Sequence, residues 1–142
     1  MIPLVLRLRN FMCYKENAVP LSFEGIHVAC LCGDNGNGKS ALLDAMTWAL
    51  WGKSRARNDD DLVHQGQKEM EVDFEFGSEG KRYRVLRKHA KASLRHSSSS
   101  LLVLHVAQES GFKDISGNKK TDTEKEIVKI LRLDYQTFIN SA

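Results

Sequence analysis

The sequence has no long apolar run and few cysteines. No stretch approaches the roughly 20 apolar residues that a membrane-spanning helix needs. The charged Arg7 and Arg9 follow only a short apolar segment, so no secretory signal is expected. The three cysteines, Cys13, Cys30 and Cys32, are an odd number without disulfide or zinc spacing. We therefore expect a reduced, cytoplasmic protein with no membrane contact.

Internal repeats are also absent, and the only low-complexity stretch is the serine run 97–100. The 142 residues are 42% hydrophobic and 27% charged, which is close to the average of globular domains. We therefore expect one domain with its own hydrophobic core. The histidines share no metal-ligand spacing, so they predict no metal site: His27, His64, His89, His96 and His105.

Acidic residues are missing between Glu79 and Glu109, where cations cluster. Residues 81–96 hold seven Lys and Arg residues, more than the formal net charge of the whole chain, +3. Such a concentration of one charge favours an anionic partner. The cations are Lys81, Arg82, Arg84, Arg87, Lys88, Lys91 and Arg95.

Hydrophobic periodicity predicts three strands and a helix in the first third of the chain. Residues 2–9 alternate as a strand, and residues 18–23 favour a second, short strand. The compact apolar run 26–32 is typical of a buried strand. Residues 39–51 are apolar nearly all round, which indicates a helix inside the core, with Gly52 as its natural end.

A β-hairpin is predicted over 70–85. Residues 70–76 alternate apolar and acidic, and 81–85 follow after the turn 77–80. A four-residue loop predicts the apolar pairs Phe74/Tyr83 and Val72/Val85, and the ionic pairs Asp73/Arg84 and Glu75/Arg82.

The last third of the chain predicts one strand and two helices. Residues 101–107 favour a strand. Two overlapping capping boxes, at 121–124 and 123–126, predict the start of a helix. Its apolar face would carry Ile127, Ile130 and Leu131. Residues 134–142 indicate a further helix.

One motif carries chemistry: residues 33–40 match G-x-x-x-x-G-K-[ST], the P-loop. The glycines let backbone N–H groups point inward at phosphates, and the N-terminus of the following helix favours bound anions. Lys39 would contact the β- and γ-phosphates, and the Ser40 hydroxyl would bind Mg²⁺. The predicted ligands are therefore ATP and Mg²⁺, held by Gly33, Asp34, Asn35, Gly36, Asn37, Gly38, Lys39 and Ser40.

The surroundings of the motif favour an ABC-type ATPase head. In small-molecule kinases the P-loop usually lies near the N-terminus and βαβ repeats follow it. Here about 30 residues of strand-like sequence precede it, and a hairpin follows its helix. The expected class is therefore α/β: a P-loop NTPase of ABC-ATPase-like type, with a mixed sheet and an antiparallel part around a buried P-loop helix.

The flanking segments resemble the bacterial SbcC type, the SMC-like ATPase subunit of a nuclease complex for DNA double-strand-break repair. The resemblance spans the whole chain. It rests on Asn10-Phe11-x-x-Tyr14, Gly25-Ile26-His27, the P-loop continuation 40–50, Trp51-Gly52-Lys53, and the segments 61–66, 70–76, 82–85 and 133–142. One departure is Met12-Cys13, where many relatives carry Arg-Ser or Arg-His, so a polar nucleotide contact is not expected there. Phe11 and Tyr14 are either packing support for the base or ordinary core aromatics.

The resemblance implies that 1–142 is the N-terminal lobe of a split head. A coiled coil and a C-terminal lobe would follow, with the Walker B acid, the catalytic glutamate and the signature motif. No catalytic residue is therefore expected within 1–142. The implied partners are the C-terminal lobe, a second copy of the head, an SbcD-type nuclease and double-stranded DNA, and the implied activity is ATP hydrolysis that regulates DNA end processing.

Two secondary sites have alternative interpretations. The resemblance implies an arginine loop near the γ-phosphate or DNA, with Arg55 and Arg57 as candidates; a solvated linker is the alternative. We expect Arg82 and Arg84 to pair with Glu75 and Asp73. The cations without an acidic neighbour are candidates for DNA contact, with a solvated loop as the alternative: Arg87, Lys88, Lys91 and Arg95.

Three other functions stay open. They are the head of another SMC-like recombination or condensation ATPase, a small P-loop kinase, and a nucleic-acid-binding module with an inactive P-loop. A heptad run with a central Cys-x-x-Cys after residue 142 would favour the SbcC type.

Overall fold

The computed structural model describes residues 1–25 and 38–141, and its centre is a six-stranded sheet of order β2-β1-β3-β4-β5-β6. Neighbouring strands in these ranges are antiparallel. The strand expected at 26–32 lies outside the described residues. The strands are β1 Ile2–Arg9, β2 Leu21–Ser22, β3 Glu69–Ser78, β4 Lys81–Ala90, β5 Ser99–Gln108 and β6 Gly111–Asp114.

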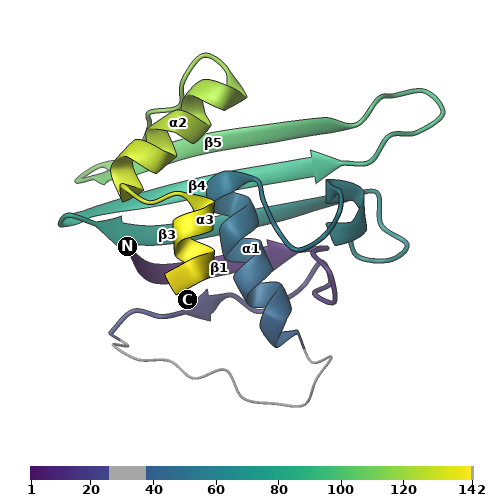
Figure 1. Ribbon diagram of the computed structural model, residues 1–142, viewed down its shortest axis with the longest axis horizontal. Coiled ribbons are helices and arrows are strands. Elements are labelled where there is room, and N and C mark those ends of the chain that lie inside the picture. The colour runs from purple at the N-terminus through teal and green to yellow at the C-terminus, as the bar shows by residue number, and fades with distance from the viewer. Residues whose placement is uncertain (26–37, 142) are drawn as a thin grey trace.

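The helices lie on one face of this sheet (Figure 1). They are α1 Lys39–Trp51, α2 Lys120–Leu131 and α3 Tyr135–Ser141, with a short 3-10 helix, η1, at Asp59–Leu62. The bounds of α1 confirm the helix predicted at 39–51. Its end is set by Gly52, whose φ of 68° is in the left-handed region and whose N–H donates to the Trp48 carbonyl at 2.7 Å.

The core lies between α1 and the inner face of the sheet. Ala45, Ala49 and Leu50 of α1 are fully buried. Opposite them are the alternate residues of the strands, including Leu6, Met70, Val72, Phe74, Phe76, Val85 and Leu104. Each large apolar side chain buried here contributes about 1.5–3 kcal/mol. Five consecutive residues of α1, from Thr47 to Trp51, are buried, so this part of the helix is enclosed on all sides, which explains why it is not apolar on one stripe alone.

The β3–β4 hairpin has a different register from the predicted one. Glu79 and Gly80 alone form the turn, and both have positive φ, 50° and 78°, as type I′ turns require. Phe74 therefore pairs with Val85 and Phe76 with Tyr83, so the predicted pairs are wrong by two residues. A slip of two keeps every side chain on its face, because strand side chains alternate with period two.

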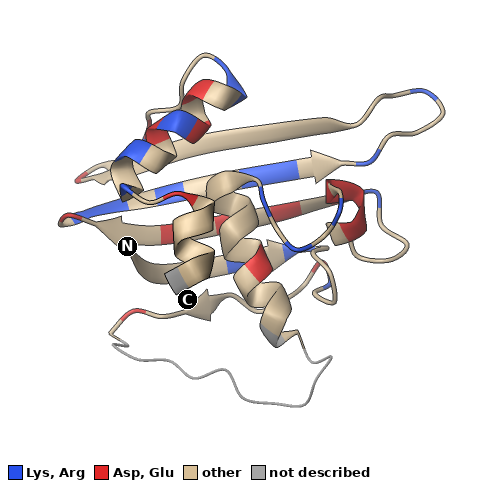
Figure 2. Cartoon of the chain, viewed as in Figure 1, with Lys and Arg blue, Asp and Glu red and all other residues tan. Residues whose placement is uncertain are grey.

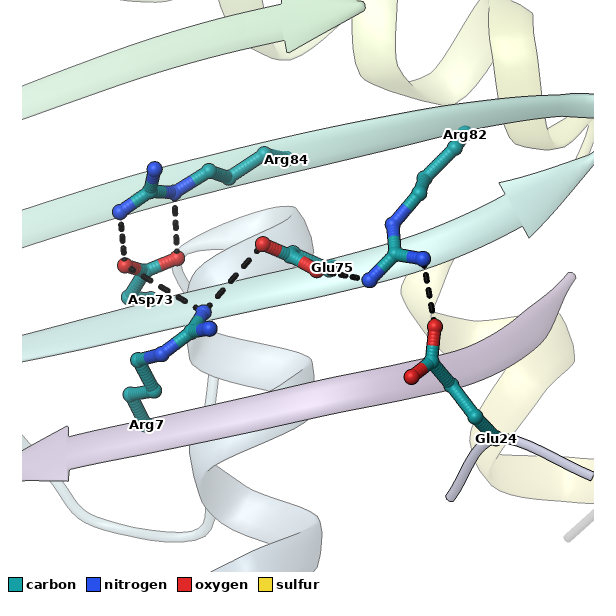
Figure 3. A network of polar contacts seen from close by, with 6 residues as sticks. All are labelled: Arg7, Glu24, Asp73, Glu75, Arg82 and Arg84. Carbon is teal, nitrogen blue, oxygen red and sulfur yellow. Dashed lines mark hydrogen bonds and ion pairs between the residues drawn. The ribbon is translucent and has the colours of Figure 1, made fainter. Parts of the chain in front are cut away.

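The outer face of the sheet carries a charge network that confirms the predicted ion pairs (Figure 3). Arg84 donates from Nε to Oδ1 of Asp73 at 2.9 Å, and Arg82 pairs with Glu75. Arg7 of β1 joins both acids, with its Nη1 at 3.3 Å from Oε1 of Glu75. The pairs are diagonal in the observed register, which long arginine side chains can span.

The start of α2 differs from the prediction. The helix begins at Lys120, after Lys119, and neither predicted capping box forms. The Thr123 hydroxyl instead accepts from the Gly117 N–H at 3.0 Å and donates to the Lys119 carbonyl at 3.3 Å. Thr123, in the first turn of α2, therefore holds the preceding loop by these two hydrogen bonds. The further helix expected at 134–142 is confirmed as α3.

Other strands depart from their predicted lengths. The strand at 18–23 is reduced to the two residues of β2, and the strand at 101–107 extends to ten residues as β5. Sequence patterns did not indicate β6, because its residues are all exposed and show no alternation. Among the described residues, every helix is too short or too polar to cross a membrane.

Candidate nucleotide-binding site

The N-terminus of α1 is open to an anion. Gly38 precedes the helix with φ 88°, no side chain of residues 1–25 or 38–141 caps it, and the first turn holds no acidic residue. The first amide groups of a helix lack intrahelical acceptors and carry the positive end of the helix dipole. Lys39 and Ser40 form the first turn, and Ser40 is exposed. The remaining P-loop residues, 33–37, lie outside the described residues.

The segment 10–14 packs against this helix start. The Tyr14 hydroxyl donates to the Gly38 carbonyl at 3.1 Å. Burial, with the neighbouring Cys13, raises the pKa of Tyr14, so the hydroxyl keeps the proton that it donates. A Cβ at position 38 would lie 2.8 Å from both Cys13 Sγ and the Tyr14 oxygen. Glycine is therefore required at position 38 by space as well as by backbone conformation.

Backbone bonds hold the segment 10–14 in place from the other side. Met12 N–H donates to the Leu62 carbonyl at 2.7 Å, and His64 N–H donates to the Asn10 carbonyl at 2.8 Å. Phe11 is fully buried, with its ring 6.0 Å from that of Trp48 in α1. Phe11 is thus a core aromatic, whereas Tyr14 touches the nucleotide loop. Packing of Tyr14 against a bound base stays a prediction.

A pocket of about 600 Å³ opens beside Tyr14. Its lining includes Asn10, Cys13, His64 and Gln67, so it offers mostly polar side chains together with the Tyr14 ring. The Tyr14 hydroxyl joins this pocket to the start of α1, because it reaches the Gly38 carbonyl. A ligand whose anionic group sits at the helix N-terminus could therefore place an attached ring in this pocket.

Arg55 and Arg57, the arginine-loop candidates, have different surroundings. Arg55 clamps Asp44, a buried acid of α1: its N–H, Nε and Nη2 donate to the carboxylate at 2.8–3.3 Å. Arg57 is exposed, and within 1–25 and 38–141 its guanidinium has no ion pair. Arg55 thus fixes the loop after α1, and Arg57 is the one available to an outside ligand.

The cations of the stretch 81–96 lie along β4 and on the loop that follows it (Figure 2), and their surroundings differ. Arg87 points into the core and is 1% exposed, so its assignment to DNA contact is corrected. Its position on the inner face follows from the same alternation that places Val85 there. Lys88 pairs with Glu71 at 3.5 Å, a partner that the sequence did not indicate. Lys91 and Arg95 remain on the loop 91–98 between β4 and β5, without an ion pair to the described part of the chain.

Comparison with known proteins places this site in a family. The family model described as "AAA domain" matches residues 6–142. The chain belongs to the AAA domain family. It is 30% identical over 141 residues to the SbcC subunit of the nuclease SbcCD from Deinococcus radiodurans, covering 97% of this chain and 15% of that protein. It is 36% identical over 138 residues to "DNA double-strand break repair Rad50 ATPase" of Halobacterium salinarum, covering 96% of this chain and 14% of that one.

A solved structure shows the same fold. It is described as "Structural biochemistry of ATP-driven dimerization and DNA stimulated activation of SMC ATPases", and it aligns with a TM-score of 0.57 at 24% identity. The alignment covers 93% of this chain and 78% of that one. The resemblance to SbcC and the ABC-ATPase-like fold class are therefore confirmed. The chain spans about a seventh of the length of these curated relatives.

Sequence reasoning missed the role of Asp44 and the contact between Tyr14 and Gly38, which both shape the site. Asp44 stood out only through the resemblance, although a single acid on an otherwise apolar helix signals a buried partner. The contact between Tyr14 and Gly38 joins residues 24 positions apart, and no local pattern encodes it. Both residues decide how the loops on either side of α1 are held.

Proposed function

We propose that this chain is the ATP-binding N-terminal lobe of an SbcC-type ATPase head that acts in DNA double-strand-break repair. The observation that carries the proposal is the P-loop sequence, which ends at Gly38 in a helix N-terminus whose first turn is free of acidic residues and which no described side chain caps. The names of the relatives support the repair role, since one is a nuclease component and another a repair ATPase.

In this proposal, residues 33–40 wrap the phosphates of ATP. Lys39 neutralises the β- and γ-phosphates, and the Ser40 hydroxyl binds Mg²⁺. The base and ribose lie toward the pocket beside Tyr14, whose lining offers the Cys13 side chain for packing and polar groups such as Asn10 and Gln67 for hydrogen bonds. Tyr14 holds the Gly38 carbonyl, which fixes the backbone at the point where the P-loop joins α1.

Turnover would need groups that residues 1–142 do not supply. A C-terminal lobe would add the Walker B acid and the catalytic glutamate, and a second head would add its signature motif. ATP would then hold two heads together, and hydrolysis would release them and regulate access of an SbcD-type nuclease to DNA ends. Arg57 is the arginine-loop residue available to the γ-phosphate or to DNA, because Arg55 is engaged by Asp44.

Binding of ATP by the full-length protein tests this proposal. Lys39→Ala should abolish binding of a fluorescent ATP analogue and ATP-dependent head dimerisation, measured by light scattering. Ser40→Ala should remove only the part of the affinity that depends on Mg²⁺. Lys113→Ala, an exposed lysine on β6, is the matched control and should bind like the parent. Parental affinity in folded Lys39→Ala would overturn the proposal.

A further inference from the structure

Arg87 is a buried arginine, and neither nucleotide binding nor DNA contact explains its position in the core. Its guanidinium lies at the C-terminal end of α1, where Nε donates to the Ala49 carbonyl at 3.2 Å. Its Nη1 pairs with Oε1 of Glu124 in α2 at 3.1 Å. The same group sits over the Trp48 ring, 5.7 Å from the ring centre. One side chain of β4 thus contacts both α1 and α2.

The end of α1 is built around this contact. The last turn of the helix has no basic residue, so the negative end of its dipole meets the Arg87 charge from the sheet. A Cβ at Gly52 would lie 2.9 Å from Arg87 Nη1 and 3.3 Å from Glu124 Oε1. Gly52 therefore gives the helix its left-handed end and also leaves room for the ion pair.

The geometry also explains why the charge is kept in the core. Burial lowers the pKa of Arg87, an effect that Glu124 opposes, but an arginine stays protonated at neutral pH. Nη2 is buried and has no hydrogen-bond partner among the described residues. A core built for stability alone would favour an apolar side chain at this place. The arginine is better explained by a link that must hold two helices in register.

The opposite end of the same helix begins the nucleotide site. Thirteen residues separate the two ends, about 20 Å at the rise of an α-helix. At the Arg87 end, Trp51 also donates from Nε1 to the Leu133 carbonyl at 3.1 Å and packs on Phe138 of α3. Helix α1 therefore begins at the P-loop and, at its other end, contacts both α2 and α3.

We propose that Arg87 is a positioning residue for nucleotide binding. Together with Glu124 it fixes α1 against α2, and this sets the orientation in which α1 presents Gly38, Lys39 and Ser40 to the phosphates. The role rests on the proposed ATP site, and it makes the position of α2 and the occupancy of that site depend on each other. Nucleotide binding should thus stabilise α2, and loss of the pair should weaken nucleotide binding.

Variants of the full-length protein separate this role from a purely structural one. Arg87→Met and Glu124→Gln should each weaken binding of a fluorescent ATP analogue about tenfold in the folded protein, which is about 1.4 kcal/mol. The double variant should bind the ATP analogue no more weakly than either single variant, because both substitutions break the same Arg87–Glu124 ion pair. Arg84→Met, three residues before Arg87 on β4 and on the outer face, is the control: it should lower the melting temperature and leave ATP affinity unchanged.

Hydrogen exchange gives the second measurement. In the parent, ATP should slow amide exchange in α2, and Glu124→Gln should remove that protection. If Arg87→Met does not fold, Glu124→Gln carries the test alone. Parental ATP affinity in the folded Arg87 and Glu124 variants overturns the positioning role while leaving the ATP site intact. A parent that binds no ATP overturns the proposed function as well.

Discussion

Glu75 offers a direct test of the charge network on the outer sheet face. Its side chain is 6% exposed and accepts from Arg82 and from Arg7 Nη1, the latter at 3.3 Å. Burial alone would raise the pKa of the Glu75 carboxyl, but the two arginines outweigh it and hold the pKa below its ordinary value of 4.5. The ionised carboxylate is thus more stable in the folded chain than in the unfolded one.

The expected magnitude follows from these contacts. Hydrogen bonds to charged groups contribute about 1.5–3 kcal/mol each when buried. Both arginine side chains are more than a third exposed, 43% for Arg7 and 37% for Arg82, so solvent screens part of this. We expect Glu75→Gln to lower the free energy of unfolding by about 1–2 kcal/mol at pH 7.

The pH dependence fixes the sign. Because the folded pKa is depressed, the contribution is complete above pH 4.5 and is lost as the pH falls through the folded pKa. Urea unfolding of parent and Glu75→Gln at pH 7 and below pH 4 measures the difference. Glu71→Gln is the control, because Glu71 is more exposed and its contacts are longer, so its loss should be about 0.5 kcal/mol. An equal gap between parent and Glu75→Gln at both pH values would refute the reasoning.

Two further predictions concern the loops. The first is the double substitution Lys91→Gln and Arg95→Gln in the full-length protein. It should make the slope of log DNA affinity against log salt shallower by about 1.8, since each phosphate contact on duplex DNA contributes about 0.9. An unchanged slope in a filter-binding series would exclude this loop from the DNA contact. Asp44→Asn should lower the free energy of unfolding by about 1–3 kcal/mol, because the buried carboxylate accepts from three donor groups of Arg55. Arg57→Gln, as its control, should stay within about 0.5 kcal/mol of the parent in the same denaturation assay.

Much of the fold was predictable because its signals are local. The apolar run of α1, the Gly52 stop and the alternation in β3 are each encoded within about a dozen residues. The ion pairs of the hairpin were predicted from the wrong register, and they form because a shift of two residues keeps the charges on one face within reach of long arginine side chains. The register was not predictable, because the choice between a two-residue and a four-residue turn leaves both faces of the strands unchanged.

The sequence by itself determined the nucleotide-loop motif, the helix that follows it and the family resemblance. Each of these depends on residue types at fixed short spacings. Only the tertiary structure decided which of the cations in 81–96 are available to an anionic partner. Arg87, Lys88 and Lys91 lie within five positions, yet the first is in the core, the second is paired with β3 and the third is on a loop. The physical reason is that burial and pairing depend on which elements cover a strand, and α1 and α2 come from segments about 30 residues or more away in either direction.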